Sequence, residues 1–138
     1  MAENSLTVQI NFMLDKAVRS IEAAQMLSDS GDYDFASSRS YYAAFYSIQA
    51  LLLTKELVYS KHSGVIAGFS EYFIRTGIFP AEYAKYISRL FRERHTGDYD
   101  FLSTISREDA EKDIKIATEL VQAINRYLDD AGYKLSDI

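Results

Sequence analysis

YDFASSRSYYAAFYSIQALLLTKE, residues 33–56, contains no glycine or proline and is apolar or small on nearly all sides of a helix. At about 100° per residue, its large side chains fall on two helical faces. One face holds Tyr41, Phe45, Ile48 and Leu52, and the other holds Phe35, Arg39, Tyr42, Tyr46 and Leu53. Such a helix belongs in the middle of a helical bundle or at a subunit seam, where small residues let a neighbour approach closely.

Four further helices are predicted around this stretch. Apolar residues recur every three or four positions over residues 10–24 and 110–128, as in long amphipathic helices. The first helix should span about residues 5–27, and the last should begin at its N-cap Ser106 and end before Gly132. A shorter helix should end at Thr76 and Gly77, and the fourth should span residues 80–94, with Gly97 letting it end.

These elements predict an all-α protein, a five-helix up-down bundle. We expect a single domain over residues 1–138, with an irregular tail from about residue 133. Within the fourth helix, Tyr83, Ile87 and Leu90 should point inward, whereas Lys85, Arg89 and Arg92 should form an outward basic stripe.

The composition excludes several functions. A net charge of −5 and a pI near 5.0 argue against a protein that coats nucleic acid by bulk electrostatics, although a local basic site remains open. The absence of cysteine removes disulfides and thiol catalysis, and we expect no metal and no cofactor. The N-terminus is acidic and no apolar run approaches the ~18 residues of a membrane span. We therefore expect a cytoplasmic protein with no membrane contact.

Arg39 lies one helical turn from Phe35 and from Tyr42. It can stack on these rings and pair with a carboxylate of another helix. It can also offer its guanidinium to a phosphate at the mouth of a groove, while Tyr42 and Tyr46 stack a base. The sequence leaves both interpretations open.

Two other places can hold an anion or a buried charge. Lys61 and His62 precede the third helix, where backbone N–H groups favour anions, although a loop with an N-cap serine explains them equally well. Arg94 falls within about 20° to 40° of the apolar face of the fourth helix. It therefore needs a carboxylate partner, for which Asp98, four residues later, is a candidate.

Together, four segments resemble the HEPN superfamily, in particular its small stand-alone prokaryotic members related to toxins paired with minimal nucleotidyltransferases. The segments are RSYYAAF at 39–45, KHSGV at 61–65, Phe69 and Phe73 before Thr76-Gly77, and Arg94 followed by Gly97-Asp98-Tyr99. They run from residue 39 to 99, and their order and spacing carry the resemblance.

The resemblance implies an up-down helical bundle that is often dimeric, in a superfamily that includes metal-independent ribonucleases. Those enzymes carry an arginine four to six residues before a histidine, a spacing that Arg89 and His95 match. The arginine would hold the scissile phosphate and the histidine would move the 2′-hydroxyl proton. In the subgroup that this sequence most resembles, however, the recurring element is arginine, two residues, then Gly-Asp-Tyr. That element corresponds here to Arg94, Asp98 and Tyr99.

Three hypotheses follow. In the first, the chain is a toxin or toxin-like ribonuclease with a nucleotidyltransferase partner, using Arg89 and His95 as a homodimer. In the second, it is a non-catalytic module that binds a nucleotide, RNA or a partner through Arg39, Tyr42, Tyr46 and the loop at Lys61 and His62. In the third, it is a purely structural helical dimer. Whether the chain is an enzyme stays open between them.

Overall fold

The computed structural model describes residues 2–99 and 104–133. These residues form five α-helices and one π-helical turn, without a strand. The elements are α1 (Ala2–Asp29), α2 (Tyr33–Leu53), α3 (His62–Phe69), the π-helical turn η1 (Ser70–Ile74), α4 (Glu82–Tyr99) and α5 (Arg107–Asp130). The predicted all-α fold of five helices is confirmed, and most of the predicted tail lies outside the described residues.

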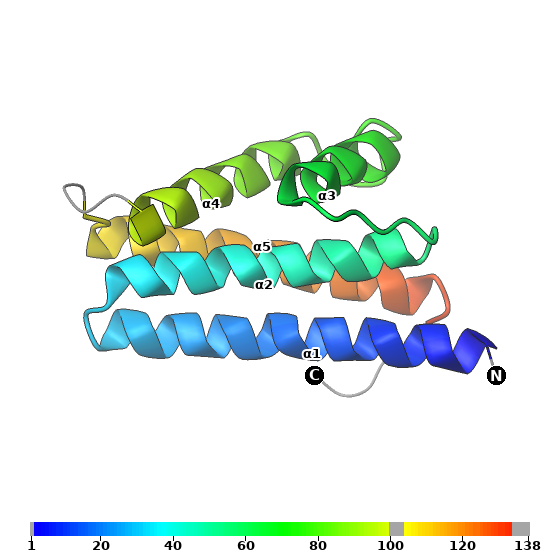
Figure 1. Cartoon of the computed structure of the whole chain (residues 1–138), viewed down its shortest axis with the longest axis horizontal. Coiled ribbons are helices and arrows are strands. Elements are labelled where there is room, and N and C mark those ends of the chain that lie inside the picture. Colours follow the sequence, from blue (N-terminus) through cyan, green and yellow to red (C-terminus); the bar gives the residue numbers. More distant parts are fainter. Residues whose placement is uncertain (1, 100–103, 134–138) are drawn as a thin grey trace.

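Helix α2 is the centre of the bundle. It packs against α1, α3, α4 and α5, and Figure 1 shows it between α1 on one side and α3 with α4 on the other. The long helices α1, α2, α4 and α5 alternate in direction along the chain, as an up-down bundle requires. Because neighbours cover nearly all of α2, its sequence is apolar or small almost all round.

The core of the bundle is built from the predicted helical stripes. Tyr41, Ile48 and Leu51 of α2 are fully buried, together with Ile10 of α1 and Ile124 of α5. Burial of each such large apolar side chain contributes about 1.5–3 kcal/mol to folding. The buried serines of α2 do not leave their hydroxyls unsatisfied, since Ser40 donates to the Ala36 carbonyl and Ser47 to the Ala44 carbonyl.

The prediction that Gly97 lets the fourth helix end is wrong, because α4 continues through it to Tyr99. A Cβ atom on Gly97 would lie 2.8 Å from the carbonyl oxygen of Asp34, at the start of α2. The glycine is therefore needed for the close approach of two helix ends and not for chain reversal. The same helix begins at Glu82, two residues later than predicted.

The ends of α5 match their prediction. The Ser106 hydroxyl accepts a hydrogen bond of 3.0 Å from the Asp109 backbone N–H, and Gly132 has a φ of +97° after the last turn. The Asp109 carboxylate does not complete a reciprocal capping box, because it pairs with Arg89 of α4. The start of α5 is therefore also part of the contact between α4 and α5.

Candidate functional site

Five polar and aromatic side chains meet where the middle of α2, the start of α3 and the end of α4 come together. We call this group the Arg94 cluster: Tyr41, Tyr42, His62, Arg94 and Asp98. The helix repeat brings Arg94 and Asp98 to one side of α4, and His62 is the first residue of α3. Segments that are distant in sequence thus form one site, which includes four of the residues predicted to bind a nucleotide or phosphate.

Arg94 is held by residues of α2 and of its own helix, α4. Its Nη2 donates a 3.0 Å hydrogen bond to the Tyr42 hydroxyl, and its Nε forms a 3.0 Å ion pair with Asp98 Oδ2. The guanidinium carbon lies 5.5 Å from the centre of the Tyr42 ring and 5.8 Å from that of Tyr41, within range of cation–π attraction. Its side chain is only 16% exposed. The predicted partnership of Arg94 with Asp98 is confirmed.

His62 packs into the same cluster. Its Nδ1 lies 2.7 Å from the Tyr41 hydroxyl, and its ring stacks on Phe45 with 4.2 Å between the ring centres. Partial burial, and then the positive charge of Arg94, lower the pKa of His62 below its ordinary value of 6.5. Burial raises the pKa of Tyr41, so that its hydroxyl keeps its proton. Both groups are therefore neutral at pH 7.

The other predicted nucleotide-binding residues lie at the edge of the cluster. The Arg39 guanidinium carbon is 4.8 Å from the centre of the Tyr42 ring, and the Tyr46 ring is 5.9 Å from that ring. The stacking predicted for Arg39 is therefore present, whereas no ion pair of Arg39 occurs within residues 2–99 and 104–133. Lys61 is exposed at the N-cap of α3, and the side chain of Tyr99 lies outside the described part of the chain.

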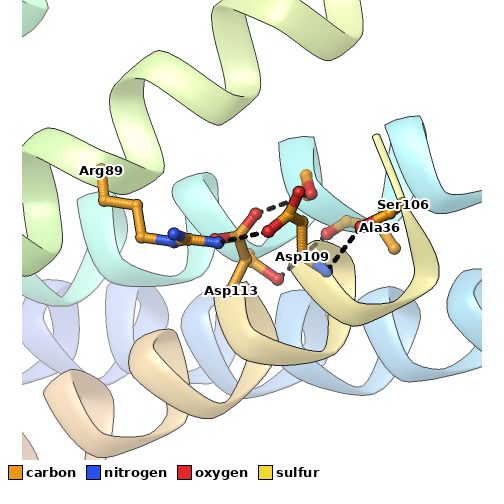
Figure 2. Close-up of polar contacts among 7 residues, drawn as sticks. Ala36, Arg89, Ser106, Asp109 and Asp113 are labelled. Carbon is orange, nitrogen blue, oxygen red and sulfur yellow. Dashed lines mark hydrogen bonds and ion pairs between the residues drawn. The ribbon is translucent and has the colours of Figure 1, made fainter. Parts of the chain in front are cut away.

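Arg89 does not belong to an outward basic stripe, contrary to the prediction. It reaches from α4 to the start of α5, where its Nε donates to Asp113 Oδ1 at 2.8 Å and its Nη2 to Asp109 Oδ1 at 3.2 Å (Figure 2). The physical reason is Asp113, whose side chain is 0% exposed and requires a cation and hydrogen bonds in the core. Ser37 of α2 supplies another of these bonds, at 2.8 Å to Oδ2.

Asp113 is a residue that the sequence reasoning missed. Burial raises its pKa to about 6, against the opposing effects of the hydrogen bonds from Arg89 and Ser37. A signal for it existed in the sequence, because Asp113 stands three residues after Ala110 and four before Ala117, on the apolar face of α5. An acid on such a face indicates a buried partner of opposite charge.

Arg89 and His95, the pair that the ribonuclease spacing selects, both lie on α4. Six residues correspond to about 600° of rotation along a helix, so the two side chains leave α4 about 120° apart. Arg89 is engaged with the two carboxylates of α5, whereas His95 is exposed. The residues that the ribonuclease spacing selects therefore face different surroundings.

An apolar groove lies beside the Arg94 cluster, between α3 and α4. It has a volume of about 430 Å³ and is lined mainly by Ile66, Phe69, Ile87 and Phe91, with Arg92 at its edge. Phe91 also touches the cluster, since its ring centre is 5.7 Å from that of Tyr41. The aromatic side of the cluster thus continues into the groove.

Two features are absent from residues 2–99 and 104–133. No group of three or more histidine or acidic side chains is arranged there to hold a metal ion. None of the helices there has the length and apolar character needed to cross a membrane.

The helical fold and the Arg94 cluster together define a class of small helical bundles. A solved structure from Thermus thermophilus has the same fold, with a TM-score of 0.73 and 18% identity, over 86% of this chain and 97% of that one. The sequence pattern of the HEPN domain matches residues 10–127. The chain belongs to the HEPN domain family, as its resemblance predicted.

Several relatives are similar over most of their length. A Methanocaldococcus jannaschii protein named "putative toxin" is 44% identical over 103 residues, which are 75% of this chain and 70% of that protein. A second protein of that name from the same organism is 35% identical over 120 residues, 87% and 89% of the two chains. A UPF0332 protein of Thermotoga maritima is 36% identical over 121 residues, 88% and 92% of the two chains.

Proposed function

We propose that this chain is the toxin-type component of a HEPN and nucleotidyltransferase pair, and that it binds RNA or a nucleotide at the Arg94 cluster. Membership of the HEPN family and the names of two relatives support the toxin part of the proposal. The nucleotidyltransferase partner rests on the family resemblance of the motifs around residues 39–45 and 94–99.

The observation that carries the proposal is the fixed position of Arg94 among aromatic rings. Asp98 and Tyr42 hold its guanidinium from two sides, so little side-chain freedom remains to be lost when a phosphate binds. Guanidinium groups bind phosphate by paired, charge-assisted hydrogen bonds, and neighbouring tyrosines can stack bases. A chain with a net charge of −5 needs such a local site to bind an anion.

The same geometry favours binding over cleavage by Arg89 and His95. For Arg89 to hold a scissile phosphate, it would have to leave Asp113, whose side chain is fully buried. Removing one partner of a buried ion pair costs about 3–5 kcal/mol, which is comparable to the whole benefit of a phosphate contact. The carboxylate that pairs with Arg94, that of Asp98, is by contrast 24% exposed and not fully buried. Ribonuclease activity through Arg89 and His95 is therefore the competing outcome in the test.

The test combines growth inhibition with RNA binding. We expect that expression of the chain slows growth of a bacterial host, that Arg94→Ala relieves the inhibition and weakens RNA binding, and that His95→Ala changes neither. If His95→Ala instead abolishes both growth inhibition and RNA cleavage by the purified protein, the ribonuclease hypothesis replaces this one. A wild-type chain that neither binds RNA nor slows growth contradicts the proposal.

The partner is tested separately. The protein encoded in the neighbouring reading frame should be a nucleotidyltransferase that co-purifies with this chain and restores growth when both are expressed. A neighbouring protein of another class, or one that neither binds nor restores growth, contradicts the paired system.

The homodimer also remains a proposal. The sequence of α2 suggested that this helix could lie at a subunit seam. In the structure, however, α1, α3, α4 and α5 pack against α2, so its apolar character is no longer an argument for a dimer. A dimer would therefore use another surface. Sedimentation equilibrium over a range of concentrations measures the assembly directly, and a chain that stays monomeric at high concentration contradicts the dimer.

A further inference from the structure

The buried hydroxyl of Tyr41 determines which nitrogen of His62 carries the proton. Tyr41 is 0% exposed, and within the described residues its recorded hydrogen-bond partner is His62 Nδ1, at 2.7 Å. If Nδ1 carried a proton and donated it to Tyr41, the phenolic proton would have no acceptor in the core, which costs about 1–3 kcal/mol. Tyr41 therefore donates to Nδ1, and the neutral His62 ring carries its proton on Nε2.

Partial burial and the charge of Arg94 keep the His62 ring neutral. Arg94 of α4 lies near the same tyrosine rings, Lys61 precedes His62 in the chain, and Arg39 of α2 lies over Tyr42. The one carboxylate of the Arg94 cluster, Asp98, is paired with Arg94. Partial burial, and then the charge of Arg94, hold the pKa of His62 below its ordinary value. His62 thus offers an N–H donor without a positive charge.

His62 and Arg94 both lie next to the rings of Tyr41 and Tyr42. The imidazole centre is 5.7 Å from the Tyr41 ring centre and 6.0 Å from that of Tyr42. The Arg94 guanidinium carbon is 5.8 Å and 5.5 Å from the same two rings. The Arg94 guanidinium and the His62 ring thus both lie beside the rings of Tyr41 and Tyr42. The His62 nitrogen that faces away from Tyr41 is Nε2, which carries the proton.

From this arrangement we propose that Arg94 and neutral His62 bind a single phosphodiester group of a nucleic acid strand. Arg94 supplies the charge, and His62 donates a hydrogen bond from Nε2 to a phosphoryl oxygen. No proton is transferred, because Nδ1 already accepts from Tyr41 and Nε2 already carries a proton. The proposal rests on the RNA or nucleotide binding proposed above and assigns His62, not His95, as the histidine of the site.

The experiment uses a dinucleoside monophosphate with 2′-O-methyl groups as the probe. This molecule has one phosphodiester, keeps a single negative charge between pH 6 and 9, and cannot be cleaved by its own 2′-oxygen. NMR of the full chain measures its affinity and the protonation of the imidazole nitrogens. We expect signals of a neutral His62 ring with the proton on Nε2, and a shift of that N–H when the probe binds.

Variants and a pH series separate the contributions of Arg94 and His62 to binding of the probe. Arg94→Gln should weaken binding about tenfold or more, and His62→Ala about fivefold, as expected for a charged and a neutral hydrogen bond respectively. His95→Ala, which changes the other histidine, should bind like the wild type. Affinity should stay constant within twofold between pH 6.5 and 8.5. The pH series needs no variant, so it tests the proposal even if His62→Ala fails to fold.

Three results would overturn this assignment. The first is a wild-type chain that does not bind the probe at millimolar concentration, and the second is a His62 proton on Nδ1 in place of Nε2. The third is an affinity that falls tenfold for each unit of rising pH, as binding by a cationic histidine would require. A site that behaves as expected in a chain that neither inhibits growth nor binds RNA refutes the proposed function alone. RNA binding that is unaffected by His62→Ala in a folded variant refutes the His62 assignment alone.

Discussion

The hydroxyl of Tyr41 is a single buried polar group on which the position of His62 depends. Tyr41→Phe keeps the ring contacts with Phe45 and Phe91 and removes only the 2.7 Å hydrogen bond to His62. We expect the free energy of unfolding to fall by about 1 kcal/mol, as measured by urea denaturation. Tyr46→Phe, which alters a half-buried ring at the edge of the cluster, is the matched control and should change stability by less. Equal effects of the two variants would argue against a structural hydrogen bond at Tyr41.

Arg94 acts on His62 through its charge. Arg94→Met keeps the length of the side chain and removes the charge, so the pKa of His62 should rise. It should remain below the ordinary value, because burial is the larger cause of the lowering. NMR titration of the His62 ring measures both pKa values. An unchanged or lower pKa in Arg94→Met would show that the guanidinium does not act on this imidazole.

Asp113 makes stability depend on pH in an unusual direction for an acid. Its pKa is about 6 in the folded chain against 3.8 for the ordinary group, so the unfolded chain loses the proton first as the pH rises. The stability that this group contributes is therefore present below about pH 4 and is lost between about pH 4 and 6. The loss should be on the order of 2–3 kcal/mol, since one pKa unit corresponds to about 1.4 kcal/mol.

The test compares the wild type with Asp113→Asn, because other acids also titrate in this range. Urea denaturation at a series of pH values should show the wild type losing stability relative to the variant between about pH 4 and 6. An advantage of the wild type that grows with pH would mean that the ion pair with Arg89 outweighs burial.

At the scale of the helices, Gly97 controls how closely the end of α4 approaches the start of α2. Gly97→Ala would favour the helix by about 1 kcal/mol through propensity alone. Its Cβ, however, would lie 2.8 Å from the Asp34 carbonyl oxygen, a backbone atom that moves only with its helix. We therefore expect a net destabilisation of about 1–3 kcal/mol and a shift of the Arg94 cluster. Thermal denaturation measures the first effect and NMR of His62 the second.

Lys85→Ala is the matched control for Gly97→Ala, because Lys85 is exposed on the same helix. It should leave both the melting temperature and the His62 signals nearly unchanged. A Gly97→Ala variant that is more stable than the wild type would show that α4 can move away from α2 without loss.

The helices themselves follow from local pattern, which is why the sequence predicts them well. The stripe from Ile10 to Ala24 and the cap at Ser106 depend only on residues within a few turns of each other. The predictions for Gly97 and Arg89 were wrong because each residue acts on another helix. Gly97 approaches the carbonyl of Asp34 in α2, and Arg89 pairs with the carboxylate of Asp113 in α5. Periodicity along one helix carries no information about such partners.

The candidate site was predictable in part for the same reason. The need of Arg94 for a partner and the choice of Asp98 follow from the spacing of one helical turn within α4. The hydrogen bond between Tyr41 and His62 joins residues 21 positions apart across the connection between α2 and α3, and only the packed bundle brings them together. Sequence reasoning therefore named both residues without pairing them.

At the scale of the whole molecule, the central position of α2 predicts that the chain unfolds as one unit. Every other α-helix packs against α2, so a partly unfolded chain that lost α2 would leave four helices without the partner that they share. We expect a single thermal transition with the same midpoint by far-UV circular dichroism, which follows helices, and near-UV circular dichroism, which follows tyrosine packing. The calorimetric and van't Hoff enthalpies should agree.

Ile48→Ala sharpens this test, because Ile48 is fully buried in α2. It should lower the free energy of unfolding by about 2–5 kcal/mol and shift both spectroscopic midpoints equally. Loss of α3 and α4 in a separate, earlier step would give two helical transitions, of which Ile48→Ala would shift one more than the other. In that case the Arg94 cluster would be the first part of the molecule to melt, since His62 and Arg94 belong to those two helices.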